Sequence, residues 1–270
     1  MRSPRRQAHH RLVVWCVGLS CLIAGFALGR VWPSRHLALV PAPPPPQAQV
    51  ALVIDDCGYH ATTMPVLRGI DRPLTLSVLP HLAYSRAMAE LGIRQHFEVM
   101  LHLPMEPKER QVAPDGLERH TLTTRMPADE VRLRLADALE SIPHVSGVNN
   151  HMGSKATTDA VLMHVVLQEL KRRGLYFVDS LVTSSSVCEQ VARSVGIRFG
   201  RRAVFLDNEN RPEAIRAQLL ALVTEAKRRG SAIGIGHDRL MTLTVIRDMI
   251  PTMEARGVRL VPVSKVVRQL

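Results

Sequence analysis

The sequence predicts an α/β domain whose parallel sheet closes, or nearly closes, into a β/α barrel. The first observation is a recurring unit, in which a helical stretch ends on a glycine and the chain resumes as a short apolar strand. Strands that alternate with helices in this way form parallel sheets. The second is the number of strands, about seven in 270 residues, which fits a barrel better than an open doubly wound sheet. The third is that no glycine-rich phosphate-binding turn follows the first strand.

The chain begins with a candidate export signal. Four arginines precede an apolar stretch at residues 12–28, and Gly29 and Arg30 follow it. This order is typical of a signal peptide or a short signal anchor whose basic end stays in the cytoplasm. The small-residue site around Ala27 is poorly suited to cleavage, so an uncleaved anchor is favoured. In either case we expect residues 40–270 to lie outside the cytoplasmic membrane, in the periplasm.

Three parts of the chain can be distinguished. Residues 1–36 form the signal peptide or membrane anchor, and residues 50–270 form the folded domain. Between them, residues 37–49 include the run PAPPPPQAQ, and such a proline-rich linker is an extended spacer rather than a packed element.

The net charge of +11 is concentrated at the N-terminus, where residues 1–36 hold six arginines and no acidic residue. The aromatic content is 4% and no basic run is interleaved with rings, so nothing indicates a nucleic-acid-binding domain. Cys57 and Cys188 are the two cysteines outside the apolar segment. They are far apart in sequence, and we expect two unpaired thiols rather than a disulfide.

Three helices of the domain can be located from their end signals. Pro127–Ser141 has two acidic residues in its first turn, and Pro212–Arg229 has a proline there. Ala160–Arg173 ends in a basic cluster, which suits the negative end of the helix dipole. The glycine after each helical stretch is expected in the left-handed conformation. These expected helix-ending glycines are Gly92, Gly174, Gly196, Gly230 and Gly257.

Polar side chains follow five of the predicted strands. They are Asp55-Asp56 after VALVI, His102 after FEVML, Asn149-Asn150-His151 after SGV, Asp179-Ser180 after YFV and His237-Asp238 after AIGIG. The carboxyl ends of all strands of a parallel barrel open on one face, so these residues should converge. Any one of them could equally be a loop residue or a strand-end cap, but five such strand ends favour a shared site.

Two adjacent carboxylates and several histidines match a divalent-metal site of the Asp/His/His kind with an open position. Such an ion would activate water and polarise a carbonyl group. Adjacent residues at a strand end point in different directions, so one carboxylate can bind the ion while its neighbour acts as a base. A Ser-His-Asp hydrolase is the competing hypothesis, but it needs a G-x-S-x-G nucleophile elbow, and the sequence has none.

Six segments, in this order, resemble the divergent polysaccharide deacetylase family, an exported bacterial branch of the carbohydrate-deacetylase superfamily. They are ALVIDDCGYH, LTLSVLP, EVMLHLPMEP, GVNNHMGSKAT, LYFVDSLVTSSSV and IGIGHDR. The resemblance covers residues 50–266 and implies a distorted (β/α)7 barrel. It also implies a glycan substrate and a divalent metal cofactor, above all zinc. Attachment to the bacterial inner membrane is expected from the N-terminal segment itself.

The resemblance carries roles onto individual residues. The Asp-Asp pair of the better-known polysaccharide deacetylases matches Asp55 as the catalytic base and Asp56 as a metal ligand. Their late histidine, the general acid toward the leaving amine, matches His237.

Their first metal-binding histidine matches His102, but the second, expected at position 106, is replaced by Glu106. The third ligand is therefore expected to be His151 or Glu106, and we prefer His151.

The remaining polar residues are assigned to substrate binding. Asn149, Asn150 and Ser154 are expected to hydrogen-bond substrate or to hold His151 in one tautomer, and a purely structural turn is the equal alternative. Asp179 is expected in the same role or just behind the site. The long polar stretch 106–124 has no periodicity and is expected to be a loop over the barrel mouth.

Two functional hypotheses follow. The first is an exported metal-dependent hydrolase that removes N- or O-acyl groups from an envelope or exported glycan. The second is a catalytically silent barrel that serves carbohydrate binding or envelope assembly. The departure at Glu106 favours the second, whereas the retention of the two aspartates, His102 and His237 favours the first. The metal content of the purified domain, residues 50–270, distinguishes the two hypotheses.

Overall fold

The computed structural model describes residues 47–109 and 117–270. Its strands are β1 (Ala48–Cys57), β2 (Thr75–Val78), β3 (Glu98–Met105), β4 (Gly147–Met152), β5 (Tyr176–Asp179), β6 (Arg198–Arg201), β7 (Val204–Phe205), β8 (Ser231–His237), β9 (Val258–Leu260) and β10 (Arg268–Gln269). Its α-helices are α2 (Met64–Arg68), α3 (Ser85–Arg94), α4 (Ala128–Ser141), α5 (Ala160–Arg172), α6 (Cys188–Val195), α7 (Pro212–Arg229) and α8 (Leu240–Ala255), and its short 3-10 helices are η1 (Leu117–His120), η2 (Ala156–Thr158) and η3 (Val263–Lys265).

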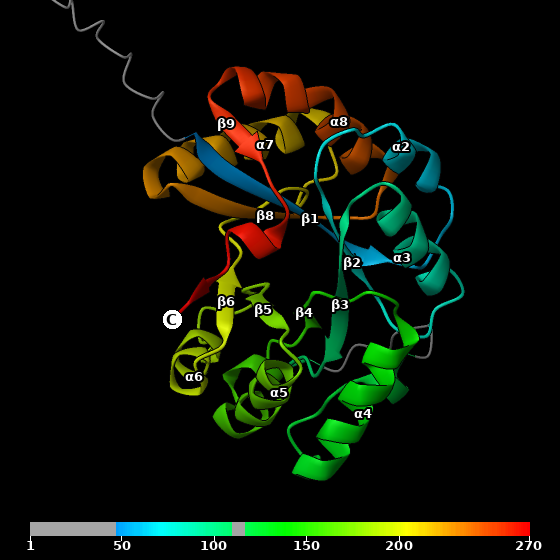
Figure 1. Cartoon of the computed structure of the whole chain (residues 1–270), viewed down its shortest axis with the longest axis vertical. Coiled ribbons are helices and arrows are strands. Elements are labelled where there is room, and N and C mark those ends of the chain that lie inside the picture. The colour runs from blue at the N-terminus through cyan, green and yellow to red at the C-terminus, as the bar shows by residue number, and fades with distance from the viewer. Residues whose placement is uncertain (1–46, 110–116) are drawn as a thin grey trace, which may run out of the picture. The chain divides into compact units, whose positions relative to one another are not determined.

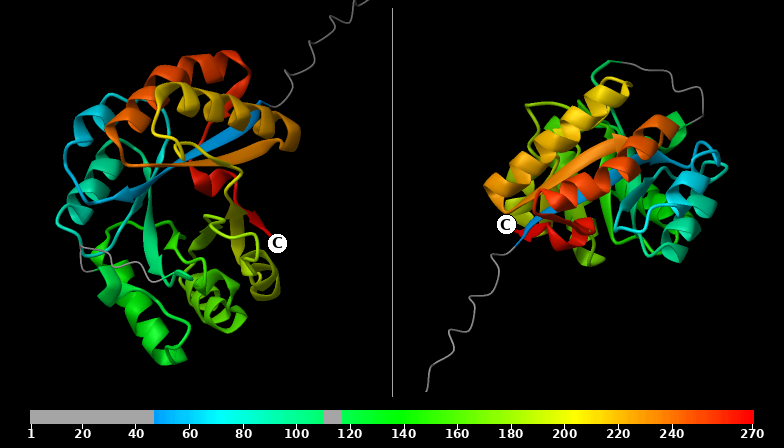
Figure 2. Two further views of the ribbon diagram at one scale, coloured as in Figure 1. Left: turned by 180° about the vertical axis from the view of Figure 1, so that it is seen from behind. Right: turned by 90° about the horizontal axis from the view of Figure 1, so that it is seen from above.

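The strands form one curled sheet in the order β10-β6-β5-β4-β3-β2-β1-β8-β7, with β9 paired to the start of β1. All these pairs are parallel except β10 with β6. The helices lie outside the curve (Figure 1, Figure 2). This confirms the predicted alternation of strands and helices around a parallel sheet. Among the described residues no pairing joins β10 to β7, so the sheet is a curled, partly open barrel.

The two faces of the sheet carry separate cores, as a strand with side chains of period two requires. Along β1, Val50, Leu52 and Ile54 face the outer helices, whereas Ala51 and Val53 face the inside of the curve. The inner cluster also includes four valines of the C-terminal segment, Val261, Val263, Val266 and Val267, and this segment runs inside the curve (Figure 1). The C-terminal segment therefore closes the inner core at the end of the sheet opposite the strand ends that carry the site.

Glu98 anchors this segment. Its Oε2 accepts hydrogen bonds from the Thr75 hydroxyl at 3.2 Å, the Tyr176 hydroxyl at 2.9 Å and the Ser264 backbone N–H at 3.0 Å. These contacts join β2, β3 and β5 to η3 and satisfy a carboxylate that would otherwise be costly to bury. Gly147 is required beside them, because a Cβ there would lie 2.2 Å from the Tyr176 ring.

The three located helices are confirmed to within one residue at each end as α4, α5 and α7. Four of the five expected helix-ending glycines have positive φ, between 70° and 82°. The prediction for Gly92 is wrong, because this residue lies inside α3. A Cβ on Gly92 would come within 3.0 Å of Val99 and 3.2 Å of Leu76. Its role is therefore the close packing of helix on sheet, and His96 takes the left-handed turn instead.

The expected signal or anchor at residues 1–36 and most of the expected linker lie outside the described residues. Within the described part of the chain, no helix combines the length and the hydropathy that crossing a membrane requires. Cys57 and Cys188 are both buried and unpaired, as expected.

Candidate active site

The two aspartates at the end of β1 reach the same histidine although they are adjacent. Neighbouring residues of a regular strand point to opposite faces, but here the register of β1 against β2 gains one residue between Ile54 and Cys57. This bulge coincides with Asp56 in the left-handed region, at φ 61°. Such a bulge re-aims a side chain. As a result His102 Nε2 lies 3.2 Å from Asp56 Oδ1 and 3.7 Å from Asp55 Oδ2.

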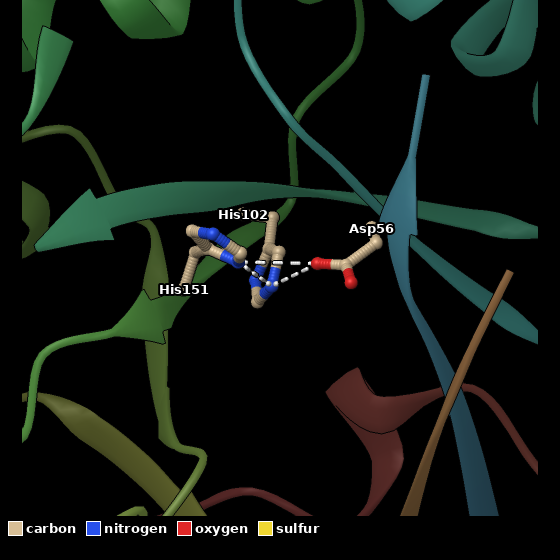
Figure 3. A group of neighbouring side chains, drawn as sticks. All are labelled: Asp56, His102 and His151. Atoms are coloured by element: carbon tan, nitrogen blue, oxygen red, sulfur yellow. Dashed lines mark hydrogen bonds and ion pairs between the residues drawn. The ribbon is translucent and has the colours of Figure 1, made fainter. Parts of the chain in front are cut away.

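Strand register brings the histidines together. His102 on β3 lies opposite Asn149 on β4, and His151 lies opposite Pro104, two residues farther along. A step of two residues keeps a side chain on the same face of the sheet, so both histidines point to the side where Asp56 lies (Figure 3).

Three ligand atoms form a nearly equilateral triangle. Asp56 Oδ1 lies 3.2 Å from His102 Nε2 and 3.1 Å from His151 Nδ1, and the two nitrogens are 3.2 Å apart. Zinc bonds of about 2.0–2.1 Å in tetrahedral geometry place neighbouring ligand atoms about 3.3 Å apart. The donor set and its spacing therefore fit a divalent ion, with the fourth position left for water or substrate (Figure 3).

Asn149 determines which nitrogen of His102 faces the triangle. Its Nδ2 donates to Asp55 Oδ1 at 2.8 Å, which orients the amide so that its Oδ1 faces His102 Nδ1 at 2.7 Å. The Ser77 hydroxyl donates to the same oxygen at 2.6 Å. An amide oxygen only accepts, so Nδ1 of His102 carries the proton and Nε2 presents its lone pair to the triangle.

The triangle consequently needs a positive charge. Asp56 Oδ1 is buried and has no hydrogen-bond partner among the described residues. Burial acts to lower the pKa of His102, but the charges of Asp55 and Asp56 outweigh it and raise that pKa. Burial likewise opposes ionisation of Asp56, yet the two histidines hold its pKa well below the ordinary value. Either an extra proton or a metal ion satisfies these facing lone pairs, and the geometry suits the ion.

Asp55 stays outside the triangle and is only 4% exposed. Burial raises the pKa of Asp55 above its ordinary value; the charge of His102 opposes this and the charge of Asp56 adds to it. With one oxygen bound by Asn149, its other oxygen remains beside the triangle. A carboxylate of raised basicity at this place suits proton transfer from a water molecule.

His237 lies in register with Asp55 on the neighbouring strand β8. Its Nδ1 is 2.9 Å from Asp207 Oδ1, and the Thr242 hydroxyl donates to Asp207 Oδ2 at 2.7 Å. Burial acts to lower the pKa of His237, but the hydrogen bond to Asp207 and its charge outweigh burial and raise that pKa. His237 Nε2, 3.9 Å from Asp56 Oδ2, is left facing the site.

The sequence reasoning missed Asp207. It follows β7, which has only two residues, too few to show strand periodicity. The strand-end rule applied to "VFLDNE" is the signal that would have found it.

Glu106, the alternative third ligand, does not join the triangle. Lys155 Nζ lies 2.7 Å from its Oε1, and the Thr124 backbone and hydroxyl donate to its Oε2 at 2.8 and 2.9 Å. The carboxylate therefore ties the chain after η1 to β3. Of the two candidates, His151 is the one grouped with Asp56 and His102.

The other residues assigned to substrate binding make hydrogen bonds within the chain. Asn149 holds His102, not His151 as considered from the sequence. Asn150 bonds the backbone of residues 152 and 180, and Asp179 accepts from the loop that follows it. The Ser154 hydroxyl accepts from the backbone of residue 108. These contacts give each residue a structural role, and their contact with substrate stays a prediction.

The chain matches a known protein family over most of the described domain. The model of a family described as divergent polysaccharide deacetylase matches residues 52–267. The uncharacterized protein YibQ of Escherichia coli (strain K12) is 35% identical over 202 residues, which are 75% of this chain and 62% of that protein. The chain thus spans less than two thirds of the length of that relative.

Two solved structures share the fold. An uncharacterized protein from Agrobacterium tumefaciens C58 is 25% identical with a TM-score of 0.77, covering 84% of this chain and 92% of that one. The catalytic domain of a peptidoglycan N-acetylglucosamine deacetylase from Eubacterium rectale is 15% identical with a TM-score of 0.51, covering 83% and 92%. At that identity the second likeness is one of fold alone, the curled α/β barrel.

Proposed function

Because this chain belongs to the divergent polysaccharide deacetylase family, we propose that it is a metal-dependent hydrolase that removes N- or O-acyl groups from a glycan. The observation that carries the proposal is the triangle of Asp56, His102 and His151, whose ligand atoms lie 3.1–3.2 Å apart. The solved deacetylase of the same fold acts on N-acetylglucosamine in peptidoglycan, which supports an acylated amino sugar as the substrate class.

Two residues beside the triangle carry out the proton transfers of hydrolysis, Asp55 as the base and His237 as the acid. A divalent ion bound there, zinc in our proposal, would supply Lewis acidity at the acyl carbonyl and lower the pKa of water. Asp55 accepts the proton of the attacking water on the oxygen that Asn149 leaves free. Burial strengthens this role, because it raises the pKa of Asp55 and makes the carboxylate a better base.

His237 performs the second transfer. An amine is a poor leaving group unless it is protonated, so cleavage of an amide needs an acid on the side of the leaving nitrogen. Asp207 accepts the hydrogen bond of Nδ1 and fixes the ring. His237 therefore exchanges its proton through Nε2, the nitrogen that faces the site.

The first experiment measures metal in the purified full chain after dialysis against a weak chelator. We expect one tightly bound ion per chain in the wild type and none in His102→Ala, with a native circular dichroism spectrum in both, because a residue at the mouth of a barrel contributes little to its core. Glu106→Gln is the matched control and should keep the ion. Retention of the ion by His102→Ala would refute the ligand assignment.

Two further outcomes would change the assignments. If Glu106→Gln lost the ion and His151→Ala kept it, the third ligand would be Glu106 and not His151. A wild type with neither bound metal nor activity on N-acylated glycans would favour the silent carbohydrate-binding or envelope-assembly barrel.

We further propose that residues 40–270 act outside the cytoplasmic membrane, tethered by the N-terminal segment. The support is the order of arginines, apolar stretch and proline-rich run in residues 1–49. A reporter enzyme that works only after export should be active when it is fused at Leu270. Activity of only a cytoplasm-dependent reporter at the same position would contradict this placement.

A further inference from the structure

A second group of metal-ligating side chains lies among the described residues and shares no member with the triangle. It consists of His81, His120 and Asp137, whose ligand atoms all lie within 4.8 Å of one another. His81 belongs to the turn after β2, His120 ends η1, and Asp137 lies in α4. We propose that these three residues bind a second divalent transition-metal ion, zinc being the first candidate.

The distances are close to those of a formed site. His81 Nε2 is 3.0 Å from Asp137 Oδ2, and His120 Nδ1 is 4.0 Å from the same oxygen. Neighbouring ligands of a tetrahedral zinc ion lie about 3.3 Å apart. A shift of less than about 1 Å by Asp137 brings both distances to this value, and its side chain is 61% exposed and free to make that shift.

The rings need one adjustment. They stack with centroids 4.0 Å apart and planes 24° from parallel, so their nitrogen lone pairs run nearly side by side rather than converge. Rotation of the His120 ring about its χ2 bond turns Nδ1 toward Asp137. This terminal torsion is broad and soft, and the His120 side chain is one-third exposed.

The surroundings favour an ion over an ordinary salt bridge. On the same helix Asp129 pairs with Arg132, and Glu130 pairs with Arg134. Asp137 instead has ion pairs only with the two histidines, as far as the described residues go. Its partners are therefore imidazoles, which carry a positive charge only when they are protonated.

The backbone also holds His81 in an unusual conformation. Its φ is 62°, in the left-handed region that residues other than glycine rarely adopt. Such strain persists where the surrounding structure over-determines it, and here it places the ring over that of His120.

The donor set indicates the class of ion. Two imidazole nitrogens and one carboxylate suit zinc, copper or nickel, whereas magnesium and calcium prefer oxygen ligands alone. An ion here would join η1 and α4 to the turn after β2. It would cross-link these three segments and, because it shares no ligand with the triangle, take no part in the hydrolysis.

The experiment is a zinc titration of the full chain without an affinity tag, followed by equilibrium dialysis without chelator at the lowest free zinc concentration that fills both sites of the wild type. We expect two ions in the wild type and one in each of Asp137→Asn and His120→Ala, with the dissociation constant of the lost site raised at least about tenfold. Asp129→Asn, on the exposed face of the same helix, is the matched control and should keep two. His9 and His10 remain in every variant, so any zinc they take up is common to all.

The proposal is overturned if the wild type binds one ion, or if Asp137→Asn and His120→Ala both still bind two. His102→Ala separates this proposal from the first site. It should also bind one ion, and its combination with Asp137→Asn should bind none. Two ions in His102→Ala together with one in Asp137→Asn would refute the first site and leave the second standing.

Discussion

Replacing Asp55 with asparagine should reduce deacetylation by at least about a hundredfold while the domain stays folded and keeps its metal. Asparagine has nearly the same shape, and its amide oxygen can still accept the hydrogen bond that Asn149 donates to Asp55. It cannot, however, take up the proton of the attacking water. The measurement is kcat/KM on an oligomer of an N-acetylated amino sugar, with metal content and circular dichroism on the same samples.

Asp159→Asn is the matched control. Asp159 caps α5 by accepting from two backbone N–H groups, and asparagine serves equally well at a helix N-cap, so activity should not change. If Asp55→Asn keeps its activity, Asp55 only orders the end of β1. If activity and folded protein are lost together, its role is structural. Either result contradicts the assignment of a base.

Replacing His237 with alanine should lower the rate on an amide substrate by about a hundred- to ten-thousandfold, the usual contribution of a general acid. The loss should be far smaller on an activated aryl ester, because an aryl oxide departs without being protonated. Comparing kcat for the two substrates on the same enzyme preparation tests the role directly.

A structural role predicts a different pattern. If His237 only holds β8 against β7, or positions the carboxylate of Asp56, both substrates should lose rate by the same factor. Equal losses would therefore reject His237 as the acid even if the variant is well folded and binds metal.

Much of the fold could be predicted because it depends on local signals that recur along the chain. Helix ends are encoded by a few neighbouring residues, so α4, α5 and α7 were located to within one residue. Gly92 shows where this fails. A glycine that ends a helix and a glycine that lets a helix approach a sheet look alike in sequence, and only the contact with Val99 and Leu76 distinguishes them.

The candidate site, too, could be predicted only in part from the sequence. The residue types at the strand ends, together with the rule that parallel strands end on one face, were enough to bring Asp55, Asp56, His102 and His237 together. The choice of His151 over Glu106 was not decided by sequence. It depends on the register of β3 with β4 and on Lys155, which neutralises Glu106 from a loop 49 residues away.

The sequence by itself determined the class of domain, the edge of the sheet that carries the site and the types of side chain available there, because these follow from local periodicity and from the handed geometry of parallel strands. Only the tertiary structure decided which atoms meet. The bulge at Asp56 arises where β1 pairs with β2, Asn149 and Ser77 orient His102 from the neighbouring strands, and Asp207 reaches His237 from the segment after β7. Such contacts depend on side-chain positions within about 1 Å, to which catalysis is sensitive, and no local propensity encodes distances of that size.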